Sequence, residues 1–252
     1  MKNSKFKDNL KKISLYLCDL LFPDHIKCVF CGDELDNSAY HNVCRTCNEK
    51  LPKIISPCLK CGSPLSLDSS GVCKTCKTNN YEFTQARSVF SYTDEIVDII
   101  HKLKYKDKPR LSKTLALFLV DVYSTWGIFP DIVTFVPMTK EKEKIRGYNQ
   151  SELLAKEFAK IVNLPIMPLC KKKRDTDSQT SLTHKERCAN VIDCFSFDNH
   201  FKNKVKNKTI LIIDDVITTG ATTNEISKVL LKHGVKDCYV LSVAHSVLDN
   251  LN

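Results

Sequence analysis

Eight of the thirteen cysteines fall in one short segment, and their spacing constrains the fold more than any other feature of this 252-residue sequence. They form four C-x-x-C pairs in two successive halves, C-x2-C-x12-C-x2-C and then C-x2-C-x11-C-x2-C. Two residues between thiolates let both sulfurs face one ion, and two such pairs complete the tetrahedral sulfur shell that Zn2+ favours. The sequence therefore predicts two structural zinc ribbons, with the ligands Cys28, Cys31, Cys44, Cys47, Cys58, Cys61, Cys73 and Cys76.

Three other interpretations of these pairs compete with zinc. A disulfide framework needs an oxidising compartment, a single C-x-x-C can be a redox pair, and an iron–sulfur cluster usually has another spacing. Four pairs in register favour zinc in closed sites that act in folding rather than in chemistry. Gly32 and Gly62 follow the leading pairs, where the chain must turn tightly beside the metal. Spacing leaves open whether the pairs combine sequentially or cross over.

The remaining cysteines are isolated in the sequence, and we expect them to be buried apolar thiols: Cys18, Cys170, Cys188, Cys194 and Cys238. Near the start, lysines precede an apolar stretch, but Asp19 interrupts it and bulky residues follow, which is unlike a signal peptide. The spacing there predicts an amphipathic helix that ends at Pro23. No apolar run approaches the ~18–20 residues of a membrane span. We therefore expect a cytoplasmic protein without a transmembrane segment.

The domain organisation follows from these patterns. We expect the N-terminal amphipathic helix in residues 1–27, the double zinc ribbon in 28–80 and an α/β domain in 81–252, where strand-like and helix-like segments alternate. Strands that are apolar throughout and joined through helices predict a parallel sheet buried on both faces. The expected strands are 83–92, 131–137, 209–214 and 238–244, and the expected helices 94–103, 111–123, 149–162 and 224–233.

One strand of this sheet runs into Ile213-Asp-Asp-Val-Ile-Thr-Thr-Gly-Ala-Thr222. Ligands of parallel sheets bind at the carboxyl ends of the strands. Two adjacent acids there repel each other unless they hold a cation or hydroxyl groups. The small hydroxylated residues and the glycine that follow can wrap a phosphate in backbone N–H groups at a helix start. The loop therefore predicts a phosphorylated ribose as ligand, and a solvated acid pair followed by helix-capping threonines is the alternative.

The string from Leu211 to Thr222 resembles the PRPP-binding loop of type I phosphoribosyltransferases, with apolar residues, two acids and V-x-T-T-G-x-T. The resemblance implies a fold of that class. It also implies that the catalytic residues Asp214 and Asp215 contact the ribose hydroxyls, directly or through Mg2+. In members that are enzymes, a nucleophile attacks C1′ of PRPP, and Mg2+ neutralises the leaving pyrophosphate. The residues that would hold the 5′-phosphate are Thr218, Thr219, Gly220, Ala221 and Thr222.

A second motif, Arg146-Gly-Tyr-Asn-Gln150, follows a lysine-rich stretch that we expect to be a mobile basic loop, 140–146. Arg146 and these lysines could bind a pyrophosphate. The motif looks like the R-G-[FY]-N-Q signature of the ComF family, competence-associated proteins that join a zinc-binding N-terminus to a phosphoribosyltransferase-like domain. Short motifs similar to those of the family at 101–105, 179–182 and 187–191 extend the resemblance over nearly the whole chain. It implies that 171–187 is the flexible loop over the site, whereas Cys188 and Cys194 depart from the family pattern.

The formal charge of +9 does not favour either region, because residues 1–80 carry twelve Lys/Arg against eight Asp/Glu and the excess in the remainder is similar. Two local clusters of basic residues are more informative than the net charge. One is Lys171–Arg174, and the other consists of alternating lysines at 202–208, which on a strand would share one face and could follow a phosphate backbone. A solvated lysine-rich surface is the alternative. Aromatic residues in the ribbon region are few for a stacking platform.

The resemblance favours a ComF-like protein with a PRPP-type pocket that assists the uptake and handling of single-stranded DNA during natural transformation. It would act with the DNA-uptake machinery at the inner face of the membrane. An active Mg2+-dependent phosphoribosyltransferase with an unidentified acceptor is the alternative, and a metabolic PRPP-binding protein is a third. No cysteine follows Met1, which argues against an amidotransferase that takes nitrogen from glutamine. No base-binding residue can be recognised in the sequence.

Overall fold

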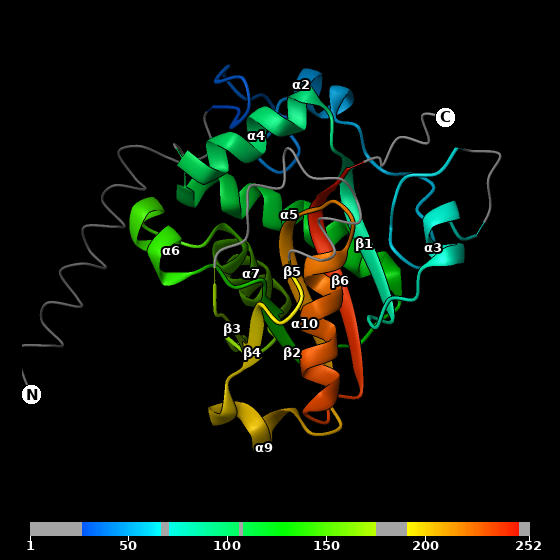
Figure 1. Ribbon diagram of the computed structural model, residues 1–252. Helices are drawn as coiled ribbons and strands as arrows, with labels where there is room; N and C mark the ends of the chain where they lie inside the picture. The colour runs from blue at the N-terminus through cyan, green and yellow to red at the C-terminus, as the bar shows by residue number, and fades with distance from the viewer. Residues whose placement is uncertain (1–26, 67–70, 106–107, 175–190, 247–252) are drawn as a thin grey trace, which may run out of the picture. The chain divides into compact units, whose positions relative to one another are not determined.

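The protein was analysed as a computed structural model, which describes residues 27–66, 71–105, 108–174 and 191–246 (Figure 1). The chain divides into two compact units after Lys50. The first contains the first cysteine tetrad and the short helix α2 (Arg45–Lys50), and the second contains the other tetrad and the sheet. The expected helix in 1–27 and most of the expected loop 171–187 lie outside the described residues.

The second unit is built on a four-stranded parallel sheet in the order β1-β6-β5-β2. The bounds are β1 Gln85–Ser91, β6 Asp237–His245, β5 Thr209–Ile217 and β2 Ile132–Phe135. All of β2 is buried, and β5 is buried except at Thr209 and Val216. The predicted parallel sheet is confirmed. Strand β5 continues three residues beyond its expected end, so that Asp215 as well as Asp214 lies within the strand.

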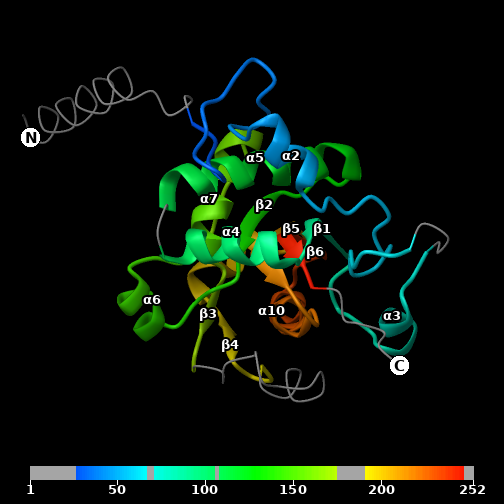
Figure 2. The same ribbon diagram turned by 90° about the horizontal axis from the view of Figure 1, so that it is seen from above.

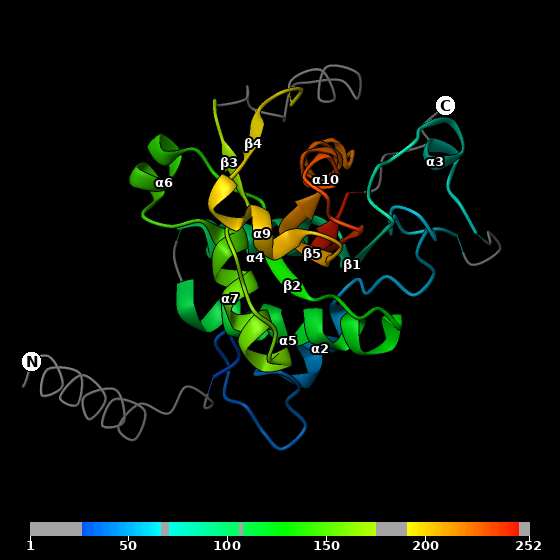
Figure 3. The same ribbon diagram turned by 90° about the horizontal axis from the view of Figure 1, so that it is seen from below.

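Helices cover both faces of this sheet, as the view from below shows (Figure 3). Helix α5 (Lys108–Trp126) contacts β1 and β6, and α7 (Gln150–Val162) contacts β5 and β2 on the same face. Helix α10 (Ala221–Lys232) packs on β6 from the opposite face. Helix α4 (Asp94–Tyr105) lies across the carboxyl ends of the strands, at the edge seen from above in Figure 2. This edge is where a parallel sheet binds its ligands.

Two basic segments fold differently from expectation. Residues 140–146 form helix α6 (Lys140–Arg146) instead of a loop, because Oγ1 of Thr139 accepts a hydrogen bond from the Lys142 N–H at 3.4 Å and caps the helix. The alternating lysines at 202–208 lie in helix α9 (Lys202–Val205) and in the turn after it. A helix rotates about 100° per residue, so alternate residues point to different sides. The prediction of a lysine track along one strand face is therefore wrong.

A short antiparallel hairpin was not expected from the sequence. It consists of β3 (Cys170–Lys172) and β4 (Phe195–Phe197), which flank the segment 175–190. The short helix η2 (Asn199–Phe201) follows it. Cys170, Cys194 and Cys238 are buried, as expected for apolar thiols, whereas Cys18 and Cys188 lie outside the described residues.

The second ribbon is hydrogen-bonded along the outer edge of β1. The N–H of Ile54 donates to the carbonyl of Val89 at 2.9 Å, and the N–H of Ser91 donates to that of Pro52 at 2.8 Å. Farther along, the N–H of Ala86 donates to the carbonyl of Lys60 at 2.7 Å. Residues 52–60 therefore cover the backbone groups that an edge strand would otherwise expose.

Gly62 allows the ribbon to approach this strand closely. Its φ of +75° is left-handed, as is the +85° of Gly32, in agreement with the expected tight turns beside the metal sites. A Cβ on Gly62 would lie only 2.7 Å from the carbonyl oxygen of Ala86 and 2.8 Å from Cα of Arg87. Both neighbours are backbone atoms that cannot move aside. Only glycine satisfies the left-handed turn and this contact together.

Candidate functional site: two cysteine tetrads and a phosphate loop

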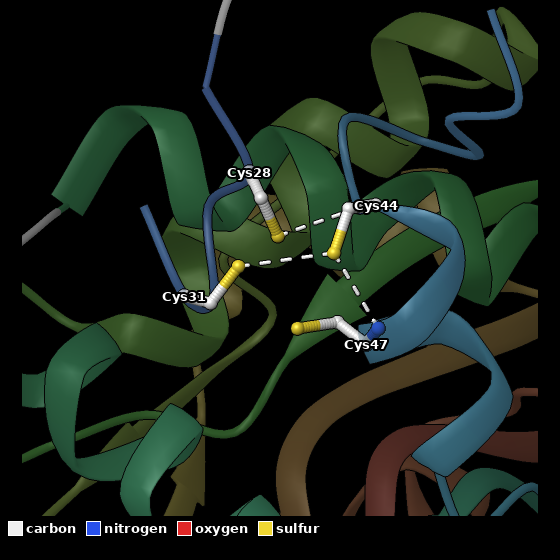
Figure 4. Close-up of side chains that lie close together, drawn as sticks. All are labelled: Cys28, Cys31, Cys44 and Cys47. Carbon is white, nitrogen blue, oxygen red and sulfur yellow. Dashed lines mark hydrogen bonds between the residues drawn. The ribbon is translucent and has the colours of Figure 1, made fainter. Parts of the chain in front are cut away.

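The first four cysteines point their sulfur atoms toward one another within residues 27–50 (Figure 4). All four Sγ atoms lie within 4.8 Å of one another, and those of Cys31 and Cys44 are 3.7 Å apart. A tetrahedral shell with Zn–S bonds of about 2.3 Å places its sulfurs about 3.8 Å apart. The N–H groups of Cys44 and Cys47 each donate to a tetrad sulfur at 3.4 Å. This donor set fits Zn2+.

The second tetrad repeats this geometry. Sγ of Cys61 lies 3.7 Å from Sγ of Cys73, and the N–H of Cys73 donates to Sγ of Cys58 at 3.2 Å. The N–H of Cys76 donates to Sγ of Cys73 at 3.4 Å, where the short helix α3 (Lys74–Thr78) begins. Each tetrad therefore combines two successive C-x-x-C pairs, which answers the question that spacing left open.

The pKa values of Cys28 and Cys31 shift in opposite directions, and so do those of Cys58 and Cys61. Burial acts to raise the pKa of Cys28, but backbone N–H groups outweigh it and lower this pKa to about 7, while the pKa of Cys31 rises to about 11. In the second tetrad, hydrogen bonds with Cys61 and Cys76 lower the pKa of Cys58, and that of Cys61 rises to about 12. The protonated members would have to lose their protons to ligate Zn2+.

Strand β5 ends in a loop around a small hollow of about 20 Å3. Gly220, with φ +75°, is the N-cap residue before α10, and the N–H of Ala221 donates to Oγ1 of Thr219 at 3.3 Å. The start of a helix favours an anion, because its first N–H groups lack partners within the helix. Of the residues expected to bind the phosphate or the ribose, those that line this hollow are Asp214, Thr218, Gly220, Ala221 and Thr222.

The two acids of β5 are both buried but differ in their partners. Oδ1 of Asp214 accepts hydrogen bonds from Oγ of Ser151 at 3.0 Å and from the N–H of Asp215 at 2.9 Å. Oδ2 of Asp215 lies 3.0 Å from Nζ of Lys104 on α4. Burial and the neighbouring carboxylate raise the pKa of Asp214, whereas the Lys104 charge overcomes burial and lowers that of Asp215. These directions favour the proton on Asp214 over Asp215, whose carboxylate has the Lys104 cation beside it.

Arg146 is not among the residues that line the hollow. Its Nη1 donates to Oε1 of Gln150 at 2.6 Å, and its guanidinium lies over the ring of Tyr105, 5.3 Å from the centroid. The Gln150 side chain in turn contributes to the lowered pKa of Asp215. Arg146 thus reaches the acid pair through Gln150.

Three residues at the acid pair were not identified as site residues from the sequence: Lys104, Gln150 and Ser151. Lys104 and Gln150 belong to the motifs 101–105 and 146–150, which carry the family resemblance, but the resemblance assigns these two residues no role. A hydrogen bond from the Tyr148 hydroxyl to the carbonyl of Leu103 holds the two segments together. In the sequence, the only indication of a role for Lys104 and Gln150 is that both belong to motifs of the ComF family.

The segment between the second ribbon and β1 contacts the phosphate loop directly. The Tyr81 hydroxyl donates to the carbonyl of Thr219 at 2.8 Å, and the N–H of Glu82 donates to Oδ1 of Asn224 on α10 at 2.6 Å. A Cβ on Gly220 would lie 3.3 Å from the Tyr81 ring. The segment that leads from the second ribbon to β1 therefore supports the loop from one side.

Comparison with known proteins agrees with this architecture. Residues 17–77 match a double zinc ribbon domain, and residues 149–250 match a phosphoribosyl transferase domain. Competence protein ComFC of Bacillus subtilis is 30% identical over 203 residues, which span 76% of this chain and 79% of that protein. The chain belongs to the ComF family.

Other relatives of this ComF protein have related names. Competence protein F of Haemophilus influenzae is 28% identical over 228 residues, which span 88% of this chain and 98% of that protein. DNA utilization protein YhgH of Salmonella typhimurium is 28% identical over 202 residues, 78% of this chain and 87% of that protein. Within the described part of this ComF protein, every helix is too short or too polar to span a membrane.

Replacing Lys104 with Met would leave the buried Asp215 carboxylate without its cation. We expect the free energy of unfolding at pH 7 to fall by about 2–4 kcal/mol, because an unpaired buried charge is costly. Since the pKa of Asp215 is lowered in the folded protein, its contribution is present above the unfolded value of about 3.9 and is lost as the pH falls through the folded value. The difference between variant and wild type should therefore shrink below about pH 4 in urea unfolding.

The matched control is Lys208→Met, which removes the cation of an exposed pair. Lys208 and Asp131 lie 2.8 Å apart with side chains 46% and 38% exposed, so solvent screening limits the expected loss to less than about 1 kcal/mol. Equal and pH-independent losses in the two variants would show that the Lys104–Asp215 pair is not the buried ion pair described above.

Proposed function

We propose that this ComF protein binds a phosphoribosyl ligand at the end of β5 and uses this pocket in handling single-stranded DNA taken up during natural transformation. The observation that carries the proposal is the phosphate loop beside the buried acid pair, in a chain whose relatives are named competence and DNA utilization proteins. A catalysed transfer is not needed for this role.

The ligand would lie with its 5′-phosphate against residues 218–222 and its ribose hydroxyls toward Asp214 and Asp215. Oδ2 of Asp215 is fully enclosed, and among the described residues it receives no hydrogen bond of good geometry, although the Lys104 ammonium is near. These carboxylates suit Mg2+, which would neutralise a pyrophosphate bound with the sugar.

The proposed DNA contact is the basic cluster 171–174 at the start of the hairpin. Nζ of Lys171 lies 2.7 Å from a carboxylate oxygen of Asp198, and Nζ of Lys172 lies 5.9 Å from the centroid of the Phe195 ring. The Lys171 side chain is 63% exposed and remains open to other anions. Basic side chains of this kind bind phosphate backbones without reading sequence. We propose single-stranded DNA and the DNA-uptake machinery at the inner face of the membrane as partners.

Titration calorimetry tests the pocket. With Mg2+ present we expect the full chain to bind PRPP, and Asp214→Asn combined with Asp215→Asn to weaken binding at least tenfold, because hydrogen bonds to charged groups contribute about 1.5–3 kcal/mol each. The control is Asp131→Asn, which changes a carboxylate at the start of β2 and should leave affinity unchanged. Wild-type affinity in the double variant would show that the acids do not bind the sugar.

Import of labelled DNA tests the biological role. A transformable host that lacks its own ComF protein should regain cytoplasmic DNA when it expresses this chain or Asp131→Asn. Expression of Asp214→Asn with Asp215→Asn, or of a chain with residues 171–174 changed to Ala, should not restore import. Full import with the acid double variant, at equal protein level, would contradict a role of the pocket in DNA handling.

A further inference from the structure

Lys104 brings a positive charge to the acid pair from a helix outside the sheet. Its Nζ lies 3.0 Å from Oδ2 of Asp215, and the two side chains are 27% and 9% exposed. The helix that carries it, α4, lies across the carboxyl ends of the strands (Figure 2). Because a partly buried ion pair is screened much less than an exposed one, this ammonium acts on any ion that binds beside Asp215.

The carboxylate oxygens of the acid pair leave little room for a metal ion while Lys104 is in place. Oδ2 of Asp215 is fully enclosed, and Oδ1 of Asp214 already accepts hydrogen bonds from Ser151 and from the N–H of Asp215. Mg2+ binds oxygen at about 2.0–2.1 Å and prefers about six such ligands. An ion bonded to Oδ2 of Asp215 would therefore lie within about 5 Å of Nζ of Lys104. Two cations this close repel each other strongly where water does not separate them.

A second positive charge lies near the first. The negative charge of Asp215 raises the pKa of Lys104, and the positive charge of Arg146 opposes this rise. Nη1 of Arg146 donates to Oε1 of Gln150 at 2.6 Å, which fixes the guanidinium on this side of the acid pair. Even with both carboxyl groups ionised, Lys104 and Arg146 balance their charge. The protein alone therefore offers no excess of negative charge to a divalent cation at this point.

We propose that Lys104 is a resident cation of the acid pair, which occupies the place of a divalent cation at Asp215 and keeps free Mg2+ out of the site. Mg2+ then enters only with a ligand whose phosphates supply further negative charge. A sugar monophosphate would bind without added metal. The statements about ligands rest on the function proposed above, whereas the exclusion of the free ion is a property of the protein alone.

Electron paramagnetic resonance with Mn2+ tests this exclusion on the full chain, purified with its zinc and without any ligand. Mn2+ prefers the same oxygen ligands as Mg2+, and its free form gives the signal. We expect Lys104→Met to gain one Mn2+ site that binds about tenfold more tightly than any site of the wild type, because a like charge at about 5 Å no longer opposes the ion. Asp215→Asn added to Lys104→Met should remove this site.

The matched control is Lys208→Met, which takes the cation from the exposed Asp131 and should gain no Mn2+ site. Lys104→Gln removes the charge but keeps a hydrogen-bond donor beside Asp215, so it replaces Lys104→Met if that variant folds poorly. Calorimetry of the wild type with ribose 5-phosphate adds a measurement that needs no variant. Its affinity should agree within about twofold with and without Mg2+, because this ligand carries no pyrophosphate for the ion to neutralise. Divalent ions are removed by dialysis, since a chelator would also take the zinc.

Several results would overturn the role of Lys104. They are Mn2+ binding by the wild type as tight as that of the Lys104 variants, no gain in these variants, or a gained site that survives Asp215→Asn. A Mg2+ requirement for ribose 5-phosphate in the wild type would also overturn it. If ribose 5-phosphate does not bind at all but the Lys104 variants gain the Mn2+ site, the phosphoribosyl ligand is wrong and the resident cation stands.

Discussion

The rest of the second unit depends on the hydrogen bonds between the strip 52–60 and the outer edge of β1. They hold the second tetrad against the sheet, and Nη1 of Arg87 strengthens the contact by donating to the carbonyl of Cys58 at 3.1 Å. Cys58 and Cys61 are part of the same buried cluster as Phe83 and Ile212. The chain then continues through Tyr81, whose hydroxyl holds the loop at Thr219. Metal site, sheet edge and phosphate loop are therefore one packed structure, in which a change at the sulfurs would be transmitted to the ligand site.

The second constraint is electrostatic. Two adjacent buried acids repel each other when both are ionised, and Lys104 of α4 supplies a cation for Asp215 while burial and the neighbouring carboxylate raise the pKa of Asp214. Helix α4 is thereby fixed over the carboxyl ends of the strands. The two acids have one protein cation, Lys104, between them. This arrangement suits a ligand that brings hydroxyl groups together with a metal cation. Protonation and ligand binding are expected to be linked at Asp214.

Features that depend on one continuous stretch of sequence could be predicted from the sequence. Features formed by segments that are distant in the sequence could not. The tetrads, the parallel sheet and the loop 218–222 belong to the first class, because ligand spacing, apolar runs and small residues before a helix act locally. Lys104 beside Asp215 belongs to the second, since the fold alone brings these two residues together. The secondary structure predicted for two lysine-rich segments was wrong, because lysine-rich composition does not distinguish a loop, a strand and a helix. The lysines of 140–146 and 202–208 are compatible with a loop and a strand, but Thr139 caps helix α6 and residues 202–205 form helix α9.

Through the segment at Tyr81, the second zinc ribbon supports the phosphate loop. Hydrogen exchange of residues 218–222 tests it most directly, measured by mass spectrometry alongside the zinc content of wild type, Cys58→Ser and Cys28→Ser. We predict two zinc ions per wild-type chain and one per variant, with faster exchange in 218–222 for Cys58→Ser only and unchanged exchange in strand β2. Cys28→Ser separates loss of a zinc ion as such from loss of the second site. A Cys58→Ser chain that has lost one zinc ion and exchanges like wild type in 218–222 would contradict the claim.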